Sequence, residues 1–194
     1  MRLTILPLIL VVLAAPIAAQ EPPLTPAALS LFEAADTGNL AEVERLVSTG
    51  IPVDVQDSEN RTPMMYAAFN GHRHVVSHLL VEGAEVDHKD GNGRTALLYA
   101  SSGPFVDTVE LLLDAGAEVD TRGMLEGFTA LMTAAAEGQV EIVRLLMDRG
   151  ADPSLEDTDG DTALDFARRN GHAEVVALIE GRVAGDAGAA QAAK

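Results

Sequence analysis

The chain has 194 residues, a formal net charge of −17 and no Cys. Such a negative field repels nucleic-acid phosphates and anionic lipids, so we expect no binding to either. The absence of Cys excludes disulfides and thiolate chemistry. Hydrophobic residues make up 47 % of the chain, but aromatic residues only 4 % and Trp is absent, so Leu, Val, Ala and Met have to build the core.

Residues 1–19 have the pattern of a secretory signal peptide. Arg2 supplies a positive charge, and the uncharged, mostly apolar stretch that follows ends in small residues at Ala19. We expect cleavage after Ala19, which leads to the periplasm of a Gram-negative bacterium or to secretion. An uncleaved membrane anchor is the alternative, but Pro7 and Pro16 oppose a stable spanning helix.

Residues 20–25 are rich in Pro and predict a stiff, extended spacer. No later apolar run reaches the length of a membrane span, so we expect the mature protein to be soluble and not membrane-bound. No Cys follows the cleavage site, which excludes a lipid-anchored lipoprotein.

Two short patterns recur along the rest of the chain with one period. A Thr followed by Ala or Pro and then apolar residues stands at Thr62, Thr95, Thr129 and Thr162, which are 33 or 34 residues apart. Gly-Ala pairs at 83–84, 116–117 and 150–151 keep the same spacing. Two independent markers with one period indicate an internal repeat.

The repeated unit resembles the ankyrin repeat. That family's unit is a β-hairpin tip, a first helix that opens at Thr-Pro-Leu, a Gly turn, a second helix with the pattern Val-Val-x-x-Leu-Leu, and then Gly-Ala-Asp. The resemblance covers residues 26–182 and implies an all-α repeat solenoid of about five ankyrin repeats, stacked with a slight curve. We place the units approximately at 26–57, 58–90, 91–123, 124–157 and 158–182.

The ends of the domain differ from its middle. The first unit lacks the Thr-Pro start, as a capping repeat often does, because one of its sides meets water. Residues 183–194 are rich in Ala and Gly, have little to bury, and predict a disordered tail.

Two units depart from the pattern. In the third unit Pro104 replaces the turn Gly, so we expect a different turn and a second helix that begins near Phe105 or Val106. The loop before the fourth unit is one residue longer than its neighbours, and the extra residue lies within 121–127. That longer tip carries Met124 and Leu125.

Few residues suggest chemistry. His74 and His78 are spaced as a metal pair on one helical face, but no third ligand is evident. Asp157, Asp159 and Asp161 match the start of a calcium loop, which then fails because Arg168 stands where the bidentate Glu belongs. We therefore predict no metal site and no cofactor. No catalytic Ser motif or phosphate-binding Gly loop is present, so we do not expect an enzyme.

The remaining candidate is a binding surface. In ankyrin-repeat proteins the hairpin tips and the concave side of the first helices hold partners, and an exposed apolar side chain there needs a reason such as binding. Carried onto this chain, the resemblance gives as candidate partner-binding residues Asn60, Phe69, Asn70, Lys89, Asp90, Asn92, Ser102, Arg122, Met124, Leu125, Glu126, Glu137, Asp159, Asp161, Arg169 and Asn170. For Met124 and Leu125, folding back onto the neighbouring tip is the alternative.

The sequence thus predicts an exported, monomeric, non-catalytic module that binds another protein. The acidic charge favours a basic partner. Two alternatives stay open: an inhibitor or immunity-type protein that neutralises a basic toxin or enzyme, and an acidic binder of divalent cations.

Overall fold

The computed structural model describes residues 24–192 of the chain. The predicted signal peptide (1–19) and most of the predicted spacer (20–25) lie outside these residues. The described part contains ten helices, which form five antiparallel pairs. The first helices of the pairs are α1 (Pro26–Asp36), α3 (Pro63–Phe69), α5 (Ala96–Ala100), α7 (Ala130–Ala136) and α9 (Ala163–Arg169). The second helices are α2 (Leu40–Ser48), α4 (Arg73–Val81), α6 (Val106–Asp114), α8 (Val140–Asp148) and α10 (Ala173–Ala192).

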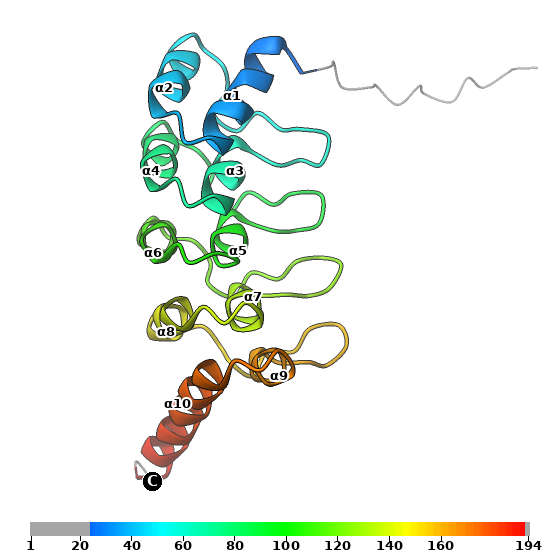
Figure 1. Ribbon diagram of the computed structural model, residues 1–194, viewed down its shortest axis with the longest axis vertical. Helices are drawn as coiled ribbons and strands as arrows, with labels where there is room; N and C mark the ends of the chain where they lie inside the picture. The colour runs from blue at the N-terminus through cyan, green and yellow to red at the C-terminus, as the bar shows by residue number, and fades with distance from the viewer. Residues whose placement is uncertain (1–23, 193–194) are drawn as a thin grey trace, which may run out of the picture.

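The pairs stack into one elongated column with two layers of helices (Figure 1). Each first helix packs on the next first helix, and each second helix on the next second helix. The loops between pairs all project from the side of the first helices. The predicted all-α repeat solenoid is therefore confirmed.

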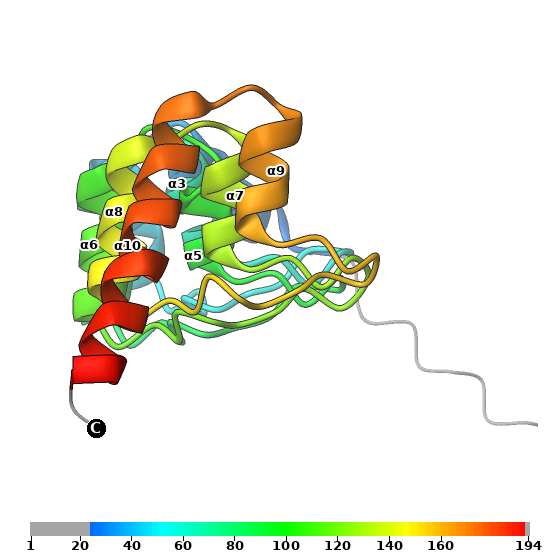
Figure 2. The same ribbon diagram turned by 90° about the horizontal axis from the view of Figure 1, so that it is seen from below.

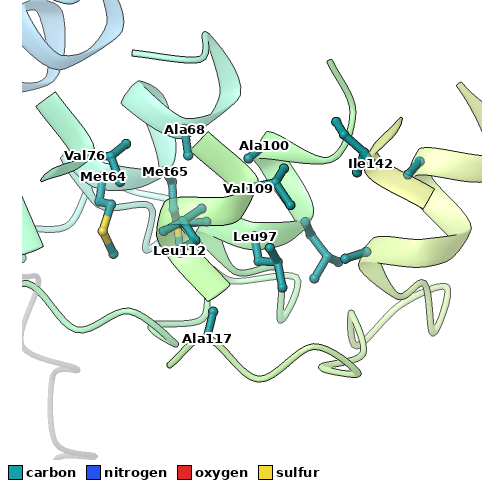
Figure 3. Close-up of a cluster of buried hydrophobic side chains, with 14 of the residues drawn as sticks. Met64, Met65, Ala68, Val76, Leu97, Ala100, Val109, Leu112, Ala117 and Ile142 are labelled. Atoms are coloured by element: carbon teal, nitrogen blue, oxygen red, sulfur yellow. The ribbon is translucent and has the colours of Figure 1, made fainter. Parts of the chain in front are cut away.

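The core runs the length of the stack and follows the expected division of sizes. Small residues such as Ala67, Ala100 and Ala134 are fully buried in the first helices, where neighbours approach closely. Larger residues such as Leu112 and Ile142 fill the space around the second helices, and Figure 3 shows this arrangement around Leu97 and Val109. Each buried Leu or Ile side chain contributes roughly 1.5–3 kcal/mol through removal of apolar surface from water.

The turns within the pairs also connect neighbouring repeats. Gly38, Gly71 and Gly138 adopt positive φ angles of about 71°, a region that side-chain-bearing residues disfavour. A ring from the following repeat lies against each Gly: His72 against Gly38, Phe105 against Gly71, and His172 against Gly138. Each contact leaves no room for a Cβ atom.

His72 and His172 are thus structural residues. The Nε2 atom of His72 lies 2.8 Å from the carbonyl oxygen of Asp36, and that of His172 lies 2.9 Å from the carbonyl oxygen of Ala136. Each ring joins its own repeat to the end of the preceding first helix.

The third pair has the different turn that Pro104 predicts. Helix α5 has five residues, whereas α3, α7 and α9 each have seven. The N–H of Ser101 still reaches the carbonyl of Leu97, and the chain then makes tight turns before α6. Helix α6 begins at Val106 with Phe105 as its N-cap, as predicted.

Four loops, which we call the tip loops, span residues 57–61, 90–94, 123–128 and 157–161. A backbone hydrogen bond of 2.9–3.0 Å closes each loop. Successive loops are also joined: the N–H of Gly91 donates to Glu59 O at 2.7 Å, and that of Met124 donates to Asn92 O at 2.6 Å. In residues 24–192 the only β-pairing is an isolated bridge between Glu156 and Thr162, so the β-hairpin form of the tips stays a prediction.

The C-terminal segment differs from the disordered tail predicted over 183–194. Helix α10 continues from its packed first turns to Ala192. Ala is the strongest helix former, and extending an existing helix needs no new nucleus, which accounts for the continuation. No helix within residues 24–192 is long and apolar enough to cross a membrane.

We predict that Gly71→Ala lowers the free energy of unfolding by about 2–5 kcal/mol. About 1–2 kcal/mol comes from the left-handed backbone. The rest comes from overpacking, typically about 1–3 kcal/mol, because the new Cβ would lie 2.1 Å from a ring carbon of Phe105. Urea unfolding followed by circular dichroism measures the loss.

Gly171→Ala is the matched control, since Gly171 occupies the same turn at φ +79° with nothing within 4 Å of its Cβ position. It should lose only the backbone contribution. Adding Phe105→Ala to Gly71→Ala should remove the clash and bring the cost of the Gly change close to that of the control. Equal losses for the two Ala variants, unaffected by Phe105→Ala, would show that the ring does not limit this turn.

Candidate functional site

The candidate site is the surface formed by the tip loops and the exposed sides of the first helices, which we call the tip-loop face. Figure 2 views the stack along its length and shows the loops extending away from the helices, so that α9 and its tip loop form two sides of a corner. Phe69, Met124 and Leu125 lie on this face and expose 52 %, 70 % and 68 % of their surface. Such exposure of large apolar side chains marks a surface suited to binding.

An Asp fixes each of the first two tip loops, half-buried in the case of Asp57 and buried in the case of Asp90. One carboxylate oxygen of Asp57 accepts hydrogen bonds from the N–H groups of Glu59 and Arg61, and the other accepts from Tyr66 Oη at 2.8 Å. Asp90 repeats the arrangement with Asn92, Arg94 and Tyr99, whose Oη lies 2.7 Å away. We call each such arrangement an Asp–Tyr lock, because it ties the loop to its first helix.

The locks shift the acidity of their members. Burial raises the pKa of Tyr66 to about 12, and its hydrogen bond to Asp57 adds to the effect. Burial and the hydrogen bond to Asp90 raise the pKa of Tyr99 to about 12 as well. Burial opposes ionisation of Asp57, but its hydrogen bonds from Arg61, Tyr66 and Glu59 are stronger together and hold its pKa below the ordinary value.

Asp90 therefore differs from its prediction as a partner-binding residue. It exposes 3 % of its surface, and its carboxylate oxygens are taken up by the lock. The Asp90 carboxylate holds the loop in position and is not available to contact a partner.

The fourth repeat has no Asp–Tyr lock. Gly123 stands where Asp57 and Asp90 stand in the earlier loops, and Thr133 replaces the Tyr nine or ten residues further on. The longer loop 123–128 is held instead by its neighbour, through the Met124–Asn92 hydrogen bond and an Arg94–Glu126 ion pair at 3.9 Å.

A pocket of about 270 Å³ opens at this repeat. Its lining is mostly apolar and includes Phe69, Leu98, Tyr99, Leu125 and Phe128. The predicted residues Asn92, Ser102 and Glu126 also line it, as do Gly123 and Thr133. Five exposed or half-buried predicted residues (Phe69, Asn92, Ser102, Leu125 and Glu126) from three repeats thus meet at one hollow.

Met124 and Leu125 behave differently from each other. Met124 lies over Gly93 of the neighbouring loop, where a Cβ on that Gly would be 2.6 Å from the Met124 Cγ atom. Leu125 lines the pocket. Folding back onto the neighbouring tip thus describes Met124, although most of its surface stays exposed.

Several other predicted residues have structural partners. Asn70 Nδ2 donates to Asp36 at 2.8 Å, and Asn170 Nδ2 donates to the carbonyl of Ala136 at 2.7 Å. A hydrogen bond joins Arg122 to the carbonyl of Glu156, and an ion pair joins Arg169 to Asp161. The predicted residues Asn60, Lys89, Glu137 and Asp159 are exposed.

The acidic loop 157–161 has the same hydrogen bonds from backbone N–H groups to an Asp carboxylate as the locks have. One carboxylate oxygen of Asp157 accepts from the N–H groups of Asp159 and Asp161, at 2.9 and 2.8 Å. The spacing that resembles a calcium loop is thus accounted for by a turn. Within residues 24–192, no group of three His, Cys, Asp or Glu residues is arranged to hold a metal ion.

Sequence reasoning missed the residues that shape the pocket. Tyr99, Phe128 and Thr133 were not among the candidates, yet they form its walls. A usable signal was present: an Asp followed nine residues later by Tyr occurs at both 57–66 and 90–99 and is absent from the fourth repeat.

We predict that both Tyr residues resist ionisation in the native protein. At about pH 11, tyrosinate absorbance should be low in the native state and high in urea, because an unfolded Tyr ionises near pH 10 and both native pKa values lie at about 12. Since the unfolded state releases the protons first, this contribution to stability is complete below about pH 10 and is lost as the pH rises toward 12.

Asp90→Asn tests the cause of the shift at one lock. It removes a negative charge beside Tyr99 and leaves Tyr66 unchanged, so about half of the absorbance change should move to lower pH. A titration curve unaltered by this substitution would mean that burial alone sets the Tyr99 pKa.

Comparison with known families identifies the fold. The family model described as ankyrin repeats (3 copies) matches residues 31–123 and 121–183, which is most of the chain. No curated protein matches the sequence. The match runs from Leu31 within α1 to Val183 within α10 and agrees with the helix–turn–helix form of the pairs. The chain belongs to the ankyrin-repeat family.

Proposed function

We propose that this protein is a non-catalytic module that binds another protein through its tip-loop face. Ankyrin repeats generally mediate protein–protein interaction. One observation carries the proposal for this face: Phe69, Met124 and Leu125 are largely exposed and come from α3 and from the longest tip loop. Exposed apolar anchors set in a polar surface are typical of binding hot spots.

The face is preorganised for binding. The Asp–Tyr locks fix two loops to their helices, and backbone hydrogen bonds join successive loops along the stack. A surface that is rigid before binding loses little conformational entropy when a partner docks. The proposed function therefore needs no rearrangement of the fold.

The charge of the face favours a basic partner. The first helices and tip loops together carry ten Asp and Glu residues against four Arg residues. An acidic surface of this kind speeds the encounter with a basic partner and makes the association sensitive to salt. The acidic loop 157–161 also supports one special case, in which the partner is a basic enzyme or toxin that the bound module inhibits.

We further propose that the protein acts outside the cytoplasm, in the periplasm or beyond the cell. The support is the N-terminal sequence, in which a positive charge precedes an apolar stretch that ends in small residues. We also propose that the chain is a monomer, since a partner of different charge suits an acidic face better than a second acidic copy.

We predict that the variant Phe69→Asp, Leu125→Asp fails to capture a partner that the natural chain retains. Residues 20–194 serve as bait in envelope extract at low salt, and mass spectrometry identifies what is retained. The two substitutions replace exposed apolar side chains of the face with carboxylates and leave the buried core unchanged, so the helical circular dichroism should not change.

The matched control is Val81→Asp, Val183→Asp. These side chains expose 79 % and 48 % of their surface on α4 and α10, away from the tip-loop face. The control adds the same charge and should retain the partner. Retention by all three baits would place binding on another surface, and no retention by the natural chain would contradict the proposed function.

We predict that the exported protein begins at Gln20. When the full chain is produced in a Gram-negative host, the mass of the periplasmic product should equal that of residues 20–194. A chain that starts at residue 20 behind an initiating Met should stay in the cytoplasm. An uncleaved product in the membrane fraction would instead support the anchor alternative.

A further inference from the structure

We propose that the pocket between α5, α7 and the tip loops 90–94 and 123–128 is a socket for one apolar side chain of a basic, extended segment of another protein. This inference rests on the proposed function and assigns the chemistry of the partner. We call this pocket the socket.

The socket exists because small residues replace large aromatic ones at two positions of the repeat. Tyr66, Tyr99 and Phe166 occupy one position in their first helices, and Thr133 is the equivalent residue of α7. At another position, Phe69 of α3 is replaced by Ser102 after α5. These smaller side chains leave space on the surface where α5 and α7 meet, and that space is the socket.

The missing Asp–Tyr lock widens the same hollow. At Gly123 no carboxylate fills the base of the loop, and the longer loop carries Leu125 and Phe128 around the opening. Helices α5 and α7 also share the least extensive contact of the four adjacent pairs of first helices. The missing lock, the longer loop and the weak α5–α7 contact thus all lie at the boundary between the third and fourth repeats.

The size of the socket suits a single side chain. Its volume of about 270 Å³ lies below the roughly 300–1,000 Å³ of typical small-molecule sites. Its walls are apolar and partly aromatic, and Tyr99 is braced edge-on by Phe69 with ring centroids 6.2 Å apart. Aromatic walls favour an aromatic or branched apolar side chain as the occupant.

A second hollow indicates that the occupant belongs to an extended chain. A pocket of about 210 Å³ lies on the other side of Phe69 and Tyr99, which line both hollows. Arg61, Met65 and Tyr66 complete much of its wall. Two hollows in a row along the stack fit successive outward side chains of an extended peptide, whereas a free small molecule would need only one.

Charge complementarity selects a basic segment. Each hollow is lined by one acidic and one basic residue, Asp36 with Arg61 in the second hollow and Glu126 with Arg94 in the socket, so the preference for a basic segment comes from the acidic surface around the hollows. Loop 157–161 continues the acidic surface beyond the socket with three Asp residues. A second copy of this chain carries the same negative charge and is disfavoured by repulsion.

A filled-socket variant tests the inference. Gly123→Asp, Thr133→Tyr rebuilds the Asp–Tyr lock of the second and third repeats inside the fourth. The backbone of Gly123 is not at positive φ, and a Cβ there would have its nearest neighbour at 3.6 Å, an ordinary contact. The variant should fold with an unchanged melting temperature or a higher one. Val81→Tyr, Val183→Asp adds the same residue types on α4 and α10 and serves as the control.

The probe is a phage-displayed library of random nine-residue peptides, selected on residues 20–194 at low salt. We expect recovered peptides to share one Phe, Leu, Ile, Met, Tyr or Trp flanked by Lys and Arg. Measured with labelled synthetic peptides by fluorescence anisotropy, affinity should fall about tenfold or more for the filled-socket variant, the size expected for loss of a hot spot. The control should bind as the natural chain does.

Three results of the peptide experiment would overturn the inference. They are failure to enrich any peptide, equal binding to the filled-socket variant, and enrichment of peptides without basic residues. A dimer of the natural chain in sedimentation that the filled-socket variant abolishes would also overturn it, since the occupant would then be a second copy.

The proposed function can survive each of these results. If Phe69→Asp, Leu125→Asp still abolishes capture of a partner while the filled-socket variant captures it normally, the module stands and the socket does not. If neither capture nor peptide selection succeeds, the proposed function fails as well.

Discussion

The structure depends on one constraint: each helix pair is apolar on two sides, and only its neighbours in the stack can cover them. Leu79, Leu112 and Leu146 hold equivalent places in successive second helices and are fully buried by this arrangement. Stability is then close to a sum of repeat and interface contributions, and no contact reaches far along the chain. A change in one repeat is accordingly felt mainly at its two boundaries.

This locality lets one boundary depart from the rest without loss of the fold. The third repeat carries the short α5 and the turn at Pro104, and the fourth begins with the six-residue tip loop and lacks the Asp–Tyr lock. The boundaries on either side keep the lock or the regular turn and hold the stack in register. In such a protein, specificity for a partner can therefore come from the irregular repeats, while the regular repeats keep the stack rigid.

The sequence predicted the features that follow from period and spacing. The solenoid, the start of α6 near Phe105 and the location of the extra loop residue could all be read from the repeat, because apolar period and turn chemistry are local properties. The exposure of Phe69 also followed from its place at the end of a first helix.

Other features depend on direction and distance between repeats, which spacing does not contain. Asp90 was expected to face a partner, but a tip Asp can turn inward when a Tyr nine residues later reaches its carboxylate. The socket arises because Thr133 lacks the aromatic ring, and Gly123 the carboxylate, of the equivalent residues in other repeats. No single residue in the sequence therefore indicates it. The continuation of α10 was missed because low burial was taken to mean disorder, although an Ala-rich segment can extend a helix that packing has already started.

The long α10 has a practical meaning for how the molecule can be held. The far end of this helix points away from the tip loops in both views (Figures 1 and 2). A dye, a solid support or a fused domain joined to the C-terminal end of the chain would thus attach on the side opposite the loops. Immobilisation through that end would present the tip-loop face outward in one orientation, with α10 as a built-in spacer.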